Sequence, residues 1–218
     1  MFRDRTEAGR LLAELVAGRL SGLSSPAGAD GCLVLGLPRG GIPVAAVVAQ
    51  VLGVRLDVLV VRKIGVPWQP ELALGAVGEG GVVVLNDDVR QAGGVGADQL
   101  DALVRKASRE VEDVVAQLRP GAGPPDVAGR TVIVVDDGVA TGATARAAAS
   151  VLRGRGSGTV IFATPVAAQS TCESLRACFD EVICVRTPAR FGSVGQHYEE
   201  FDQVSITQVH QLLDASPT

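Results

Sequence analysis

Two adjacent carboxylates, Asp136 and Asp137, stand where a run of branched apolar residues ends. A turn of small residues follows and carries two hydroxyl groups, on Thr141 and Thr144. The alanine-rich segment after this turn predicts a helix, whose free N-terminal N–H groups favour an anion. Small side chains let a phosphate approach the backbone closely. Acids that accept hydrogen bonds from hydroxyl groups, beside a phosphate cradle, indicate a ribose 5-phosphate site.

Basic residues follow two other apolar runs and are further candidates for anion binding. Arg39 and Gly40 come after the run at 32–37, in the sequence Pro-Arg-Gly-Gly. The guanidinium of Arg39 offers a bidentate fork to phosphate oxygens. Lys63 comes after the run at 55–61. It is either another phosphate ligand or a solvated loop charge.

Strands and helices alternate along the chain, and this order predicts an α/β fold. A mostly parallel, doubly wound sheet with helices on both faces is expected, in a single domain that spans residues 1–218. The acids then lie at the carboxyl end of a central strand, where such sheets bind ligands. The predicted strands are 32–37, 55–61, 132–135, 159–165 and 181–185. The predicted helices are 6–20, 43–52, 98–118, 144–155, 166–177 and 208–213.

Three segments interrupt this alternation. Residues 65–81 are rich in proline and glycine, and part of them can pair with 82–85 as a hairpin. Residues 86–98 are polar and glycine-rich, and their GGVG lacks the third glycine of a dinucleotide-binding motif, which argues against such a site. The segment 186–204 gathers a large share of the few aromatic residues. These rings either stack on a planar ligand or anchor the segment to the core.

Composition excludes several classes of function. The net charge of −4 argues against a broad nucleic-acid surface. No apolar run is long enough to span a bilayer, and the N-terminus lacks a signal-type apolar core, so we expect a cytoplasmic protein without a membrane partner. The four cysteines form no CxxC pair, which predicts reduced thiols and no protein-built metal cage.

Residues 132–144, VIVVDDGVATGAT, resemble the phosphoribosyl-pyrophosphate (PRPP) signature of type I phosphoribosyltransferases. That pattern is a branched apolar run, two acids, a short apolar pair, a small residue, then Thr, Gly, any residue and Thr. Gly138 departs from the bulkier residue expected at its position. The distinctive positions are held by Asp136, Asp137, Thr141, Gly142 and Thr144.

The resemblance implies Mg²⁺-dependent transfer of a 5-phosphoribosyl group from PRPP to a small nitrogen acceptor, with a nucleobase expected, and release of pyrophosphate. Asp136 and Asp137 would be the catalytic acids that orient the ribose hydroxyls, directly or through metal-bound water. Mg²⁺ would be held through PRPP and water, either without a direct protein ligand or with Asp136 or Asp137 as one. The 5-phosphate would be bound by Val139, Ala140, Thr141, Gly142, Ala143 and Thr144. The pyrophosphate would be bound by Arg39, Gly40 and Lys63.

The resemblance also assigns roles to the interrupting segments. Residues 65–81 would be a mobile loop that closes over PRPP and excludes water. Residues 186–204, with part of the N-terminal region, would form a small hood in which Phe191 or Tyr198 binds the acceptor. A homodimer is plausible. A regulator that senses PRPP or a nucleotide without catalysis is the main alternative, and a hydrolase of phosphoribose compounds or nucleotides is the third class.

Overall fold

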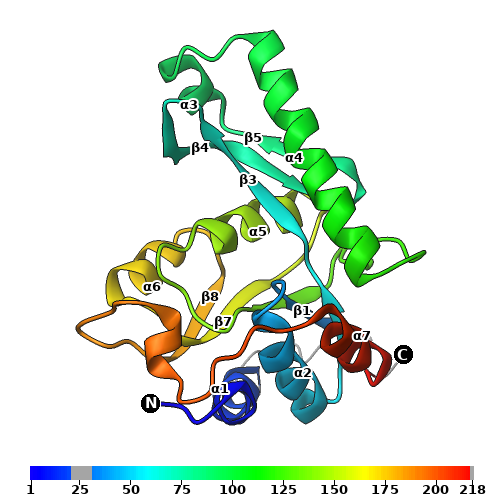
Figure 1. Cartoon of the computed structure of the whole chain (residues 1–218), viewed down its shortest axis with the longest axis vertical. Coiled ribbons are helices and arrows are strands. Elements are labelled where there is room, and N and C mark those ends of the chain that lie inside the picture. Colours follow the sequence, from blue (N-terminus) through cyan, green and yellow to red (C-terminus); the bar gives the residue numbers. More distant parts are fainter. Residues whose placement is uncertain (21–30, 217–218) are drawn as a thin grey trace.

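A five-stranded parallel sheet forms the base of the molecule, and a three-stranded antiparallel sheet rises from it (Figure 1). This computed structural model describes residues 1–20 and 31–216. The linker that precedes the first strand therefore lies almost wholly outside the described residues.

The parallel sheet confirms the predicted fold class. The direction in which successive strands are added reverses between β1 and β6, which makes a topological switch point where such sheets bind ligands. Gly36 of β1 pairs with Val135 of β6, so both strands end at the same level. In spatial order the strands are β2 (Arg55–Val58), β1 (Cys32–Gly36), β6 (Thr131–Val135), β7 (Val160–Val166) and β8 (Glu181–Arg186).

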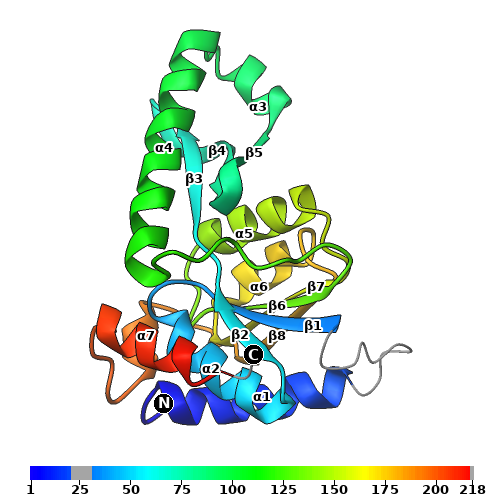
Figure 2. The ribbon, with the colours of Figure 1, turned by 90° about the vertical axis from the view of Figure 1, so that its right-hand side faces the viewer.

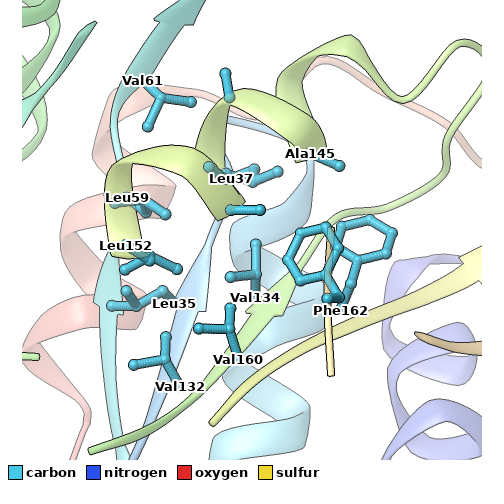
Figure 3. Packing of buried hydrophobic residues seen from close by; sticks show 14 of the residues in the cluster. Leu35, Leu37, Leu59, Val61, Val132, Val134, Ala145, Leu152, Val160 and Phe162 are labelled. Carbon is cyan, nitrogen blue, oxygen red and sulfur yellow. The ribbon is translucent and has the colours of Figure 1, made fainter. Parts of the chain in front are cut away.

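Helices cover both faces of this sheet. Because successive side chains of a strand point to opposite faces, Leu33 and Leu35 pack under α5, whereas Val34 packs against α1 and α2. Figure 3 shows the core on the α5 side, with Leu35, Val132 and Val134 beneath that helix. The covering helices are α1 (Arg5–Leu20) and α2 (Gly41–Leu52) on one face, and α5 (Ala143–Gly154) and α6 (Gln169–Leu175) on the other.

The antiparallel sheet has its own helical cover. One face packs on the long helix α4, where Ile64 and Leu74 meet Leu100 and Val111. The other face lies over α5, so that α5 is between the two sheets (Figures 1 and 2). The elements of this part are β3 (Val61–Val66), β4 (Gln69–Gly78), β5 (Val82–Leu85), α3 (Asp87–Ala92) and α4 (Ala97–Leu118).

The strand predicted at 55–61 is wrong in its extent. It ends at Val58, and the chain then crosses into the second sheet, where Lys63 lies inside β3. Buried carboxylates satisfy the backbone at the crossing, since Asp57 accepts from the N–H of Val58 and Glu79 from the N–H of Val60, both at 2.8 Å. Lys63 is therefore not at the carboxyl end of a core strand.

Two other segments differ from their expected conformation. Most of 65–81 is strand β4, paired with β3 and β5, and its mobility stays a prediction. The polar segment 86–98, for which the sequence predicted no helix, contains helix α3, capped by Asn86, which accepts from the N–H of Val89 at 3.1 Å. This helix has no buried residue, so no apolar stripe marks it in the sequence.

Helix ends follow local capping chemistry. Asp4, and not Thr6, caps α1, because its carboxylate accepts from the N–H of Glu7 at 2.7 Å. The terminal helix α7 (Ile206–Asp214) starts with a capping box formed by Ser205 and Gln208. Within the described residues, every helix is too short or too polar to cross a bilayer.

Candidate functional site

The two predicted anion-binding turns meet at the switch point of the parallel sheet. A Cβ atom added at Gly40 would lie 2.1 Å from Oδ2 of Asp137, and one at Gly41 would lie 2.5 Å from the carbonyl oxygen of Val135. Only glycine permits this approach of the two backbones. The structure thus brings the turn that carries Arg39 against the paired acids.

The acids share a desolvated environment. Asp136 accepts a hydrogen bond from the N–H of Asp137 at 3.0 Å. Burial raises the pKa of Asp136 well above its ordinary value, and the negative charge of Asp137 raises it further. Burial also raises the pKa of Asp137, against the opposing effect of the Arg5 guanidinium. Such a pair favours hydroxyl donors or a cation as its ligand.

Arg5 is a site residue that the sequence analysis missed. Its Nε donates to Oδ2 of Asp137 at 2.9 Å, and both side chains are about nine-tenths buried, with exposures of 13% and 12%. The two residues are 132 positions apart. In the sequence Arg5 is one cation beside the first turn of a helix, and no local pattern separates it from Arg3 or Arg10.

The turn that follows the acids presents backbone donors. Gly142 has a φ of 73° and forms the N-cap of α5. Within the described residues, nothing accepts from the N–H groups of 140–145. Some carbonyl groups of the turn are occupied, because Thr171 donates to Ala140 at 2.6 Å and Arg146 donates to Thr141. A helix N-terminus of this kind binds a phosphate.

The segment 186–204 lies against the N-terminal segment, and the role of the two as an acceptor-binding hood stays a prediction. The N–H of Phe2 donates to the carbonyl of His197 at 2.7 Å, and the N–H of Glu199 donates to the carbonyl of Phe2 at 2.8 Å. A Cβ at Gly138 would lie 2.4 Å from Cγ1 of Val194. The unexpected glycine of the signature is therefore where this segment packs on the turn.

The two predicted acceptor-binding rings have different surroundings. Tyr198 is only 5% exposed, packs between Phe2 and Phe201, and donates its hydroxyl to the carbonyl of Asp137 at 2.6 Å. It holds the main chain of the acid turn. Phe191 is half-buried and stacks on His197, with ring centres 5.2 Å apart. An acceptor contact stays a prediction for both rings.

Lys63 lines a cleft that neither Asp136 nor Asp137 lines. This cleft, of about 490 Å³, runs between the antiparallel sheet and α5, and Thr141 and Arg146 also line it. Among the described residues of its lining there is neither an acid of the pair nor Arg39. The structure therefore does not place Lys63 with the other predicted pyrophosphate ligands, and that role stays a prediction.

The comparisons with known proteins identify the family. The sequence pattern of the phosphoribosyl transferase domain matches residues 6–200, so the chain belongs to the phosphoribosyl transferase domain family. The crystal structure of TT1426 from Thermus thermophilus is similar over 98% of this chain and 97% of that chain, with 41% identity and a TM-score of 0.85.

A curated relative is "Putative phosphoribosyl transferase Rv0571c" from Mycobacterium tuberculosis. It is 47% identical over 214 residues, which are 98% of this chain and 46% of that protein. The chain thus spans about half the length of the curated relatives it matches. The AQ2163 protein of Aquifex aeolicus is 13% identical over 88% of this chain and 78% of that chain, with a TM-score of 0.52, and shares the fold.

Proposed function

We propose that the chain transfers a 5-phosphoribosyl group from PRPP to a nitrogen acceptor, a nucleobase, with release of pyrophosphate. One observation carries this proposal: two desolvated carboxylates, Asp136 and Asp137, immediately precede a helix N-terminus with unpartnered N–H groups at 140–145 among the described residues. A sugar with hydroxyl groups at one end and a phosphate at the other satisfies both. Membership of the phosphoribosyl transferase domain family supports the same assignment.

The residues of the site have separate tasks in this reaction. Cleavage of the bond between C1 and the pyrophosphate oxygen develops positive charge on the sugar and negative charge on the leaving group. Asp136 and Asp137 orient the ribose hydroxyls, and the turn at 139–144 holds the 5-phosphate. Arg39 and Gly40, in the turn that packs against the acids, hold the leaving pyrophosphate. Positioning both ends of the substrate lowers the barrier for transfer.

The donor atoms at the site fit Mg²⁺ as a shared ion. Carboxylate oxygens of Asp136 and Asp137 suit this hard cation, which keeps several waters and is commonly bound through one or two carboxylates and substrate phosphates. Within the described residues, no three metal-ligating side chains gather into a cage. When bound, Mg²⁺ neutralises charge on the leaving pyrophosphate.

A binding experiment tests the proposed pocket. We expect PRPP with Mg²⁺ to raise the melting temperature of the wild type, since a ligand at 100 times its Kd stabilises by about 2.7 kcal/mol. Asp136→Ala combined with Asp137→Ala should remove this stabilisation. Glu199→Ala with Glu200→Ala, another adjacent pair but exposed, is the matched control and should keep it. A double variant at 136 and 137 that PRPP still stabilises would refute the pocket.

Pyrophosphate release separates the three classes of function. Release that requires PRPP and one base from a panel indicates a transferase. PRPP binding without any release supports the non-catalytic regulator, and release without an acceptor supports a hydrolase. A cytoplasmic location and a homodimer stay predictions from the sequence.

A further inference from the structure

The guanidinium of Arg5 connects the acid pair to the hood. It donates to Oδ2 of Asp137 through Nε at 2.9 Å and to the carbonyl of Asp202 through Nη1 at 2.8 Å. Its carbon Cζ lies 4.0 Å from the centre of the Phe201 ring. One side chain from α1 therefore touches both the proposed sugar-binding acid and the segment proposed to bind the acceptor.

Residues outside the signature contact both the side chain and the main chain of Asp137. Arg5 holds the carboxylate, and the hydroxyl of Tyr198 holds the main-chain carbonyl at 2.6 Å. The Tyr198 ring stacks on Phe201 with centres 5.0 Å apart, and Phe201 in turn packs on Arg5. Arg5, Phe201 and Tyr198 therefore contact one another in series, and the first and the last of them both contact Asp137. Because the guanidinium is planar and its donors are fixed, it sets the direction of the carboxylate oxygens.

We propose that Arg5 is a positioning residue that aligns the Asp137 carboxylate with a ribose hydroxyl of PRPP and couples sugar binding to the hood. This inference rests on the proposed function. Within the described residues, Arg5 is the one basic side chain that forms an ion pair with either acid of the pair. Loss of its charge removes both the alignment and the link to Asp202.

The test compares three variants of the full chain by calorimetric titration with PRPP and Mg²⁺ at neutral pH. Arg5→Met should weaken PRPP binding by about 10- to 100-fold, since a charge-assisted hydrogen bond is lost. Arg5→Lys should recover part of the affinity, because it keeps the charge without the fork. Arg10→Met, an exposed cation on the same helix, should bind as the wild type does.

The outcomes for this inference and for the proposed function are distinct. Wild-type affinity in Arg5→Met would overturn the role of Arg5, while loss of binding in the Asp136 and Asp137 double variant would leave the proposed function standing. If PRPP binding changes in neither, the proposed function itself is wrong. Where Arg5→Met does not fold, Arg5→Lys decides: full wild-type affinity in this variant overturns the inference.

Discussion

The chain holds two pairs of carboxylates that are at least partly buried, and neighbouring cations compensate their charges very differently. Asp57 and Glu79 lie where the chain crosses from the parallel to the antiparallel sheet, with side-chain exposures of 5% and 1%. The guanidinium of Arg119 bonds to both of them. Asp136 and Asp137 lie at the switch point, and Arg5 pairs with Asp137 only. The first pair shares a cation, whereas the second leaves one acid without a cation among the described residues.

This difference indicates that Asp57 and Glu79 form a structural cluster, whereas Asp136 and Asp137 are suited to bind a ligand. The oxygens of Asp57 and Glu79 also accept from the N–H groups of Val58 and Val60, so their charge is used inside the protein. Burial raises the pKa of Glu79, but the N–H of Val60 and the charge of Arg119 both act against that rise. At the switch point the pKa is raised for both acids, and Asp136 forms no ion pair among the described residues, although the charge of Arg5 acts weakly against the rise of its pKa. This cost in the free protein is recovered when a ligand supplies hydroxyl donors or a cation.

The largest expected effect is at the compensated cluster. Arg119→Met should lower the free energy of unfolding by about 3–5 kcal/mol, because it removes the ion pair of the buried Glu79 and leaves the buried Asp57 with only the exposed Arg55 as its cation. Urea denaturation measures this change. Arg153→Met is the control, since Arg153 pairs with Asp180 at the surface, with exposures of 41% and 45%, and should cost less than about 1 kcal/mol. Equal losses of unfolding free energy in the two variants would show that the buried cluster stabilises the fold no more than a surface ion pair does.

At the switch point we expect a smaller change in the free energy of unfolding, of the opposite sign. Asp136→Asn keeps an oxygen that can accept from the N–H of Asp137 but removes one of two neighbouring buried charges. We expect its free energy of unfolding to be about 1 kcal/mol higher at neutral pH, a typical gain when a functional strain is removed, and its PRPP binding to be lost. The melting temperature and a PRPP titration together check this. A less stable variant would mean that the charge of Asp136 is well compensated.

The smallest expected effect is the pH dependence of the difference in unfolding free energy between Asp136→Asn and the wild type. A carboxyl group whose folded pKa is raised stabilises the fold while protonated, and this contribution is lost as pH rises through the folded pKa. The advantage of Asp136→Asn over the wild type should therefore be present at neutral pH and shrink as pH falls toward 3.8, the ordinary value for an aspartate. Chemical denaturation of both proteins at several pH values tests this. An advantage that grows on acidification would contradict the raised pKa.

The sequence was sufficient where local pattern and chemistry coincide. The apolar run before Asp136, the small-residue turn and the alanine-rich helix each have a short-range cause, and the structure places them as strand, turn and helix. The turn that carries Arg39 could also be placed, because strand order brings two carboxyl ends together. These elements need no knowledge of distant contacts.

Contacts between distant residues could not be predicted in the same way. The apolar run at 55–61 continues past Val58, and only the buried carboxylate of Glu79, 19 positions beyond Val60, marks where the sheet changes. Arg5 meets Asp137 only after the whole core has folded. The aromatic residues of 186–204 fitted either anchoring or ligand binding, and the contacts of Tyr198 favour anchoring for that ring.

Helix α5 lies between two sheets, and its small alanine side chains let both sheets pack close to its backbone. Ala145, Ala147, Ala148 and Ala149 are all buried in one cluster with Leu35 of the lower sheet and Ala76 of the upper one. Such a helix has no room to tilt or slide without opening a void on one side. A phosphate bound at the first turn of α5, as proposed, would therefore meet a helix end that packing on both sides holds in place.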